Sequence, residues 1–178
     1  MKLVKIIALF LCVCMILSAC CVHNNEDGTT STTLLRIHVR ANSNDTADQS
    51  VKMIVKDELT SFLEDELVGV TDFDDAIAVV KRVLPTLKRI AKRTLEREGF
   101  SYGVRVAVKN EYFPTRSYYG VVVESGYYDA LIVELGEGKG DNWWCVIYPP
   151  LCFVSAKGNG QITYRSKIKE MWDEFIKG

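Results

Sequence analysis

Residues 34–57 read LLRIHVRANSNDTADQSVKMIVKD, a stretch in which two different periodicities meet. At its start Leu35, Ile37 and Val39 alternate with charged or polar side chains. A period of two with branched apolar residues predicts a strand with one buried face. The other face carries Arg36, His38 and Arg40. We expect that face to be polar and either exposed or turned toward a partner.

A turn and a helix follow this strand. Residues 41–45 are turn formers, and Thr46 with Gln49 three positions later fits a capping box. Apolar residues then recur at helical spacing, namely Val51, Ile54, Val55, Leu59, Phe62 and Leu63. The change of period predicts that the strand is followed by an amphipathic helix.

Two more helical stretches are predicted downstream. The first begins near residue 71, where three aspartates suit the positive end of a helix dipole. Pro85 should break or kink it, because the residue before a proline avoids the helical conformation. The second covers residues 86–98 and stops at Gly99. Its basic side chains form either an anion site or, as we favour, a solvated helix face: Lys88, Arg89, Lys92, Arg93 and Arg97.

The rest of the chain turns to strand patterning. Strands are predicted at residues 102–108, 118–123, 128–135 and 143–148, with a last helix at residues 165–176. The predicted fold is therefore α+β. It is a single compact domain over residues 34–178, with an N-terminal strand, about three helical segments, several β-strands and a C-terminal helix.

The first 22 residues have the pattern of a targeting segment. Lys2 and Lys5 precede an apolar run over residues 6–17, which has the length of a signal-peptide core. The run ends in Leu17-Ser18-Ala19-Cys20, which resembles the lipobox of bacterial lipoproteins. That resemblance implies cleavage before Cys20 and a lipid on its sulfur. An ordinary cleaved signal and an uncleaved anchor are the alternatives.

The segment after the apolar run is polar. Residues 22–33 read VHNNEDGTTSTT, a composition that cannot bury itself. We expect residues 1–19 to be a signal peptide or an anchor and residues 20–33 to be a flexible tether. The domain should then lie outside the cytoplasm. Any membrane contact is expected through the N-terminus only, because the rest of the chain has a slight excess of acidic residues.

Composition excludes several classes of function. The chain has 178 residues, a formal net charge of -1 and 25% charged residues, the balance of an ordinary globular protein and not of a general nucleic-acid binder. The two histidines, His23 and His38, exclude a histidine-rich metal site. They also give no Ser-His-Asp set. We therefore expect no catalytic residue, no cofactor and no metal.

Four of the six cysteines lie in the first 21 residues, which leaves Cys145 and Cys152 in the body of the chain. In an exported protein, two cysteines this close predict a disulfide. A Cys145 nucleophile with His38 as its base is the sharper alternative, because a histidine can activate a thiol. Zinc at these three residues would lack a fourth ligand and paired cysteine spacing.

The segment before Cys145 is rich in glycine and tryptophan. Residues 136–140 (GEGKG) are glycine-rich like a phosphate loop, but Gly140 stands where a P-loop needs Ser or Thr. We therefore favour a tight connection between two strands. Trp143 and Trp144 lie on the following strand and should point to opposite faces. One then fills the core, and the other is either an outward partner anchor or buried too.

Two stretches resemble the stage II sporulation protein R family and together cover about residues 34–154. In residues 36–57 the family's pattern is matched by His38-Val39, Ala41-Asn42-Ser43, Asp48-Gln49, Lys52, Val55 and Asp57. Residues 136–153 read GEGKGDNWWCVIYPPLCF and are similar to the family's glycine-rich loop, Asn-Trp-Trp-Cys and Pro-Pro-Leu-Cys-Phe block. Between them, Phe113-Pro114-Thr115 and Tyr119-Gly120 stand where the family has the same segments.

The resemblance implies an exported signal of sporulation. Members of this family are made in the forespore of endospore-forming bacteria and exported across its membrane. There they trigger a membrane-embedded aspartic protease of the mother cell, which cleaves the inhibitory pro-segment from pro-sigma-E. The implied partner is this protease. The implied location is the space between the two membranes, with the chain secreted or lipid-anchored to the outer face of the cell membrane.

We expect the partner to be contacted by the turn after the first strand and by the tryptophans, because exposed polar groups beside aromatic anchors are typical of interfaces. The residues expected to make the contact are His38, Arg40, Asn42, Ser43, Trp143 and Trp144. Two other functions stay open. They are a Cys-dependent extracytoplasmic hydrolase and a ligand-binding surface lipoprotein.

Overall fold

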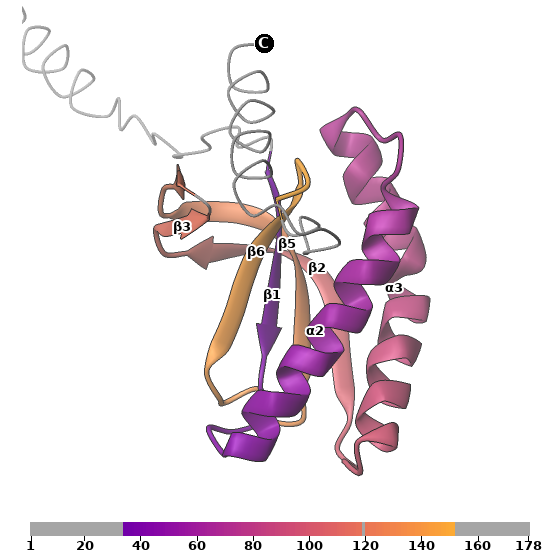
Figure 1. Cartoon of the computed structure of the whole chain (residues 1–178). Coiled ribbons are helices and arrows are strands. Elements are labelled where there is room, and N and C mark those ends of the chain that lie inside the picture. The colour runs from indigo at the N-terminus through magenta and orange to yellow at the C-terminus, as the bar shows by residue number, and fades with distance from the viewer. Residues whose placement is uncertain (1–33, 119, 152–178) are drawn as a thin grey trace, which may run out of the picture. The chain divides into compact units, whose positions relative to one another are not determined.

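The structure, a computed structural model, describes residues 34–118 and 120–151. These residues form a four-stranded mixed sheet, two helices over one of its faces and a small hairpin packed against the other (Figure 1). The fold is α+β, as predicted. The predicted leader, tether and C-terminal helix lie outside the described residues. Within the described ranges, no helix is both long and apolar enough to cross a bilayer.

The first strand lies inside the sheet. The strand order is β2-β5-β1-β6, in which β1 (Leu35–Arg40) is parallel to β5 (Gly126–Leu135) and antiparallel to β6 (Asn142–Tyr148). At one edge β2 (Val104–Phe113) runs antiparallel to β5. The strands predicted near residues 102–108, 128–135 and 143–148 are therefore confirmed, with β2 extended toward its C-terminal end.

Two helices bury the apolar face of β1. The side chains of Leu35, Ile37 and Val39 are all 0% exposed and pack with α2 (Thr46–Glu66) and α3 (Phe73–Arg97). The helix positions that meet them are Val51, Val55, Leu59, Leu63, Ala76, Val80, Leu87, Ala91 and Leu95. Burying each larger aliphatic side chain contributes about 1.5–3 kcal/mol, so this layer supplies much of the stability of the domain.

The two helical stretches predicted on either side of Pro85 are one helix, α3. Asp72 caps it by accepting hydrogen bonds from the backbone N–H groups of Asp74 and Asp75. Proline has no backbone N–H, so the carbonyl of Lys81 loses its helical hydrogen-bond donor. Because Pro85 is exposed, that carbonyl lies on the solvent-facing side of the helix. The prediction of a break was wrong because buried residues before and after Pro85 hold both halves against the same core.

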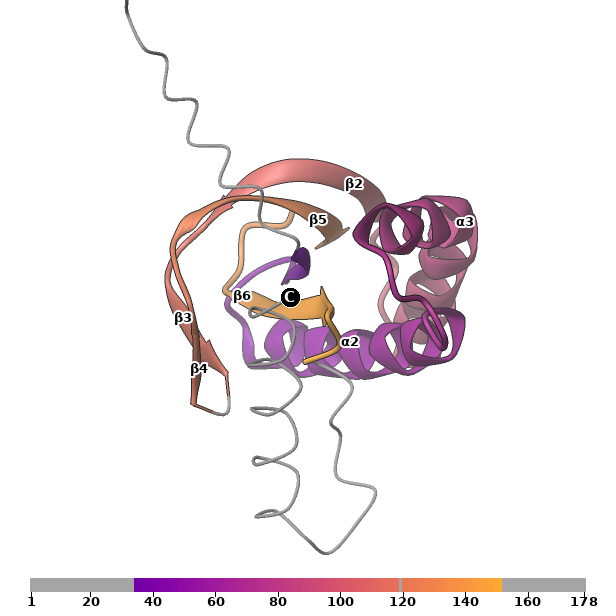
Figure 2. The ribbon, with the colours of Figure 1, turned by 90° about the horizontal axis from the view of Figure 1, so that it is seen from above.

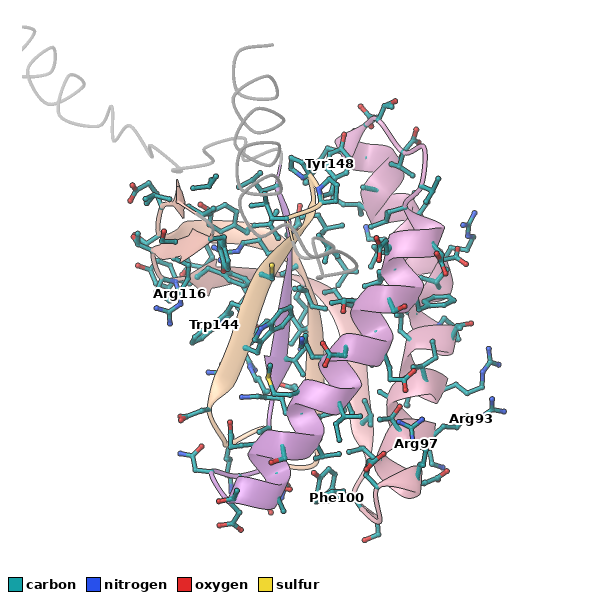
Figure 3. All side chains as sticks on the ribbon, in the orientation of Figure 1. Arg93, Arg97, Phe100, Arg116, Trp144 and Tyr148 are labelled. Carbon is teal, nitrogen blue, oxygen red and sulfur yellow. The ribbon has the colours of Figure 1, made fainter. Side chains whose placement is uncertain are left out.

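The start of α2 also differs from its prediction. Thr46 is the first helical residue, and Asp45 is the N-cap without a side-chain capping bond. The side chain of Gln49 instead donates to the carbonyl oxygen of Ser43 at 2.9 Å. The basic face of α3 agrees with its prediction, since its side chains are exposed and Arg93 points away from the domain (Figure 3). Arg97 on this face forms an ion pair with Glu58 of α2 at 3.0 Å.

The strand predicted at residues 118–123 is a hairpin. Its strands β3 (Arg116–Tyr118) and β4 (Val121–Val123) pair only with each other among the described strands, and Gly120 adopts a φ of 90° at the turn. Seen from above, β2 and β5 curve away from α3 toward this hairpin (Figure 2). Val121 and Val123 are buried in a second core on the sheet face opposite the helices.

Candidate functional site

The polar face of β1 is buried and not exposed as predicted. Arg36 is 0% exposed and His38 is 4% exposed, while Arg40 is half-buried. The sheet curves over this face and the β3–β4 hairpin packs against it, which single-strand alternation cannot reveal. Arg36 and His38, which the sequence placed on an exposed or partner-facing surface, therefore lie inside the domain, on the sheet face against which the hairpin packs.

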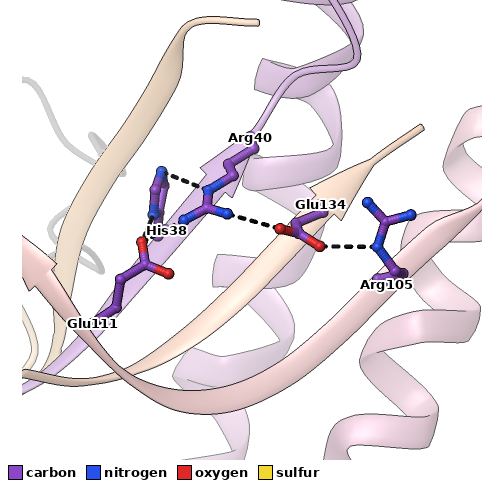
Figure 4. Close-up of polar contacts among 5 residues, drawn as sticks. All are labelled: His38, Arg40, Arg105, Glu111 and Glu134. Carbon is purple, nitrogen blue, oxygen red and sulfur yellow. Dashed lines mark hydrogen bonds and ion pairs between the residues drawn. The ribbon is translucent and has the colours of Figure 1, made fainter. Parts of the chain in front are cut away.

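Charged side chains from three strands form a network on this sheet face, from the buried His38 to Arg105 at the surface (Figure 4). Glu111 of β2 accepts hydrogen bonds from His38 and Arg40 of β1. Its Oε1 lies 2.7 Å from His38 Nδ1 and 2.5 Å from Arg40 Nη2. Arg40 Nη1 donates to Glu134 Oε1 on β5 at 2.7 Å. Glu134 Oε2 in turn accepts from Arg105 Nε on β2 at 2.9 Å. Each carboxylate in the network is thus shared by two basic side chains.

His38 is neutral in this network. Burial, the largest influence, lowers the pKa of His38 below its ordinary value, although hydrogen bonds with Asn142 and Glu111 oppose the shift. Arg40 Nε lies 3.5 Å from His38 Nε2. A guanidinium nitrogen can only donate a hydrogen bond, so His38 Nε2 is the acceptor. The proton therefore resides on Nδ1 and is donated to Glu111. Both ring nitrogens of His38 are therefore engaged with side chains of this network, and the ring holds Glu111 and Arg40 in place.

Trp143 and Trp144 point to opposite faces of the sheet, as predicted, and both are half-buried. Trp143 packs on the helix-side core, where Lys56 Nζ lies 5.3 Å from its ring centroid. Trp144 stacks beside His38, with ring centroids 5.3 Å apart, and Arg116 Cζ lies 4.3 Å from its ring centroid. Arg116 and Trp144 lie side by side on the side of the sheet away from the helices (Figure 3).

Asn42 and Ser43 make internal contacts. Both donate to Asp48 Oδ2, Asn42 Nδ2 at 2.8 Å and Ser43 Oγ at 2.6 Å, and the Tyr102 hydroxyl donates to Asp48 Oδ1 at 2.8 Å. Asn42 Oδ1 also accepts from the backbone N–H of Glu137 at 2.9 Å. We call Asn42, Ser43, Asp48 and residues 136–140 the loop brace. It joins the β1–α2 turn to the β5–β6 connection.

The glycines of the loop brace permit its close backbone approach. A Cβ at Gly140 would lie 2.0 Å from the carbonyl oxygen of Ser43. A Cβ at Gly136, where φ is 58°, would lie 2.1 Å from Asn42 Oδ1. The glycine-rich segment is therefore a tight strand connection, as predicted, and it packs against the residues that precede α2.

The Cys–His alternative fails on geometry. In the β1–β6 register, His38 pairs with Trp144 and Ile37 pairs with Cys145, so Cys145 lies on the helix face and His38 on the opposite face. Cys145 is also disulfide-bonded. Its expected partner, Cys152, lies outside the described residues, as does Cys20, so that pairing and the lipid attachment stay predictions. No metal-holding group of His, Cys, Asp and Glu occurs in the described part of the chain.

Several site residues escaped the sequence reasoning. Glu111, Glu134 and Arg105 complete the charge network, and Asp48 anchors the loop brace. Arg105, Lys109 and Glu111 share one face of β2, which was a visible signal of a polar sheet face, whereas Glu134 is the one charged residue on the matching face of β5. The pairing of β2 with β5, which brings these charges beside β1, was not visible in the sequence.

Comparisons with known proteins agree with the motifs. The family model of stage II sporulation protein R matches residues 31–158. Stage II sporulation protein R of Bacillus subtilis (strain 168) is 36% identical over 136 residues, which cover 76% of this chain and 60% of that protein. The chain thus spans less than two thirds of this relative's length. No solved structure matches the chain significantly.

Proposed function

Since the chain belongs to the stage II sporulation protein R family, and is thus a protein of sporulation, we propose that it is an exported signal between the two cells. It activates the membrane-embedded aspartic protease of the mother cell, which then processes pro-sigma-E. The proposed location is the space outside the forespore membrane, where the chain is either secreted or anchored by a lipid on Cys20. The family match over most of the chain is the observation that carries this proposal.

The site chemistry supports binding over catalysis. The charge network pairs its basic groups with Glu111 and Glu134, and the imidazole of His38 uses both nitrogens within that network. Cys145 has no route to His38 because the sheet separates them. We therefore propose that the chain is not an enzyme and that it acts by shifting the protease toward an active state.

We place the contact surface at Trp144 and Arg116. Both side chains are half-buried, and an aromatic ring under a guanidinium presents a large apolar surface with a polar rim. His38 and Arg40 hold this surface from beneath, because His38 stacks against Trp144. Asn42 and Ser43 act on this contact surface indirectly, through the loop brace. Trp143 remains a contact candidate from the helix side of β6.

The proposal is tested by co-expressing the chain with pro-sigma-E and the matching protease in a host that does not sporulate. An immunoblot should show the shortened sigma factor only when the chain is present and exported. Trp144→Ala should lower the cleaved fraction about tenfold or more, because truncating a central aromatic anchor costs about 2 kcal/mol or more of binding. Val68→Ala is the matched control, since Val68 is an apolar side chain that is 77% exposed on another surface.

Intact precursor in the presence of exported, folded chain would contradict the signalling proposal. Full cleavage with a folded Trp144→Ala variant would contradict only the contact surface. Circular dichroism of the purified variants separates a loss of contact from a loss of fold.

A further inference from the structure

We propose that Arg36 is a binding site for a carboxylate, supplied by an aspartate or glutamate in a segment of a partner protein. Arg36 lies in the centre of the domain, between Ala130 of β5 and Val146 of β6. It is 0% exposed and lies outside the charge network of Figure 4. The inference is independent of the protease, because it rests on the chemistry of this one side chain.

The guanidinium of Arg36 has donors to spare. Nη2 donates to the Tyr118 hydroxyl at 2.8 Å, but Nε and Nη1 have no hydrogen-bond partner among the described residues. A buried donor without an acceptor costs about 1–3 kcal/mol, and more when it is charged. Native proteins leave few such groups, so two on one side chain indicate a ligand that is absent from the free domain.

Nothing in the described part of the chain neutralises the charge. The groups around Arg36 are aromatic, with its Cζ 4.2 Å from the ring centroid of Phe113, 4.9 Å from that of Tyr128 and 5.9 Å from that of Tyr118. Burial, the largest influence, lowers the pKa of Arg36, and a second cation, Arg116, lowers it further. Two guanidinium groups without a carboxylate make a strongly attractive site for an anion.

The shape of the surroundings favours a carboxylate over a phosphate. A carboxylate is planar and can lie in the plane of the guanidinium, so it fits where flat aromatic rings border that group. A phosphate is tetrahedral and carries a larger charge. Burying it among apolar rings would therefore cost more desolvation free energy. The aromatic lining thus selects for a singly charged, flat anion.

The β3–β4 hairpin controls access to Arg36. Its strands make ladder hydrogen bonds only with each other among the described strands, so beyond its short joins to β2 and β5 it is held against the sheet by side-chain packing. The hydroxyl of Tyr118 in this hairpin accepts a hydrogen bond from Arg36 Nη2. A carboxylate is a stronger acceptor than a phenol, so the ligand replaces the Tyr118 hydroxyl as the hairpin moves outward.

The test reads the Arg36 Nε–H directly by proton–nitrogen NMR, using the full-length chain in mild detergent. The probe is acetyl-Gly-Glu-Gly-amide, and its control is acetyl-Gly-Gln-Gly-amide, which keeps the shape and lacks the charge. The Glu peptide should shift the Arg36 signal saturably, and the Gln peptide should shift it about tenfold less. Tyr118→Phe should bind the Glu peptide more tightly, because it removes the competing acceptor.

The Arg36→Met variant identifies the Arg36 Nε–H signal, because that signal is missing from its spectrum. It also separates an effect on peptide binding from an effect on the stability of the fold. Replacing a buried, unpaired charge with an apolar residue of similar length should leave the urea midpoint unchanged or raise it, while peptide binding is lost. A lowered midpoint would mean that Arg36 serves the fold and would overturn the proposal. So would an equal response to inorganic phosphate, or no response to the Glu peptide in both the wild type and Tyr118→Phe. The titration contains no protease, so either result leaves the proposed signalling role untouched.

Discussion

At the scale of single residues, Asp48 of α2 connects the β1–α2 turn to the segment that precedes β2. It is 6% exposed and accepts hydrogen bonds from Asn42, Ser43 and Tyr102. Burial by itself would raise the pKa of Asp48, but the hydrogen bond from Ser43, followed by those from Asn42 and Tyr102, outweighs it and holds the pKa below its ordinary value. The carboxylate therefore stays ionised at neutral pH as the acceptor that the loop brace needs.

Asp48→Asn should lower the free energy of unfolding by about 2–3 kcal/mol, because an amide replaces a charged acceptor and meets three donors with a donor of its own. Urea denaturation at pH 7 measures the change. Asp45→Asn is the matched control, since Asp45 is exposed and makes no side-chain capping bond, and it should change the stability by less than about 0.5 kcal/mol.

The lowered pKa of Asp48 also predicts how the difference in stability between the wild type and Asp48→Asn depends on pH. A carboxylate whose pKa is lower in the folded state stabilises fully above its unfolded pKa of about 3.9. That stabilisation disappears as the pH falls through the lower folded pKa. The gap between wild type and Asp48→Asn should therefore be constant from pH 7 to about pH 5 and shrink below about pH 4. A gap that widened in acid would show that the pKa of Asp48 is raised instead.

Single residues also show where alternation along the sequence misleads. The pattern around β1 correctly assigned Leu35, Ile37 and Val39 to the core. It assigned Arg36 and His38 to an open face, because it contains no information about what covers that face. Glu111 lies on β2 and the covering Tyr118 lies on the hairpin, and both reach β1 only through tertiary pairing.

At the scale of elements, the β5–β6 connection packs so closely against the β1–α2 turn that Gly136 and Gly140 have no room for a side chain. Gly140 N donates to the Ala41 carbonyl oxygen at 2.9 Å, and its missing Cβ lets it approach Ser43. Asn42 contributes the side-chain contact to the same connection. The relative position of the two loops therefore depends on glycine as much as on hydrogen bonds.

Gly140→Ala should lower the free energy of unfolding by about 1–3 kcal/mol, because the added Cβ would overlap the Ser43 carbonyl oxygen and push the loops apart. Gly103→Ala is the control, since no atom lies within 4 Å of the Cβ it would add. Thermal unfolding of the two variants measures the difference. Equal melting temperatures would contradict the role given to Gly140.

The elements themselves were largely readable from periodicity. Both helices and four of the strands appear where apolar spacing predicted them. The exceptions have local causes. Pro85 was given too much weight against the core contacts on both sides of it, and Gly120 at a left-handed φ turned one predicted strand into a hairpin.

At the scale of the whole molecule, the predicted disulfide ties β6 to the chain that follows it. If Cys145 pairs with Cys152, the closed loop of about eight residues contributes about 2.5 kcal/mol in the chain-entropy model. Cys145→Ser and Cys152→Ser should then lower the stability by a similar amount.

Alkylation followed by mass spectrometry of the peptides that contain Cys145 and Cys152 checks the pairing. Both thiols should react only after reduction. Two alkylated thiols without reductant would reject the disulfide.

The family and the α+β class were predictable for the whole molecule, whereas the arrangement of the site was not. Motifs of neighbouring residues, such as Asn42-Ser43 and Trp143-Trp144, are visible in a sequence and point to the family. The network of Figure 4 joins residues from separate strands, so it follows from sheet order. The strand order is set by the packing of the whole chain, so it cannot be read from any single segment of the sequence.

The interior position of β1 has a consequence for how the chain folds. β1 is the first strand to leave any channel that releases the chain from its N-terminus, yet both of its partners, β5 and β6, are the last described strands to emerge. The central hydrogen bonds therefore wait until nearly all of the domain has been released, and such long-range closure makes folding slow. A chain released from its N-terminus therefore stays without its central strand pairings until β6 has emerged.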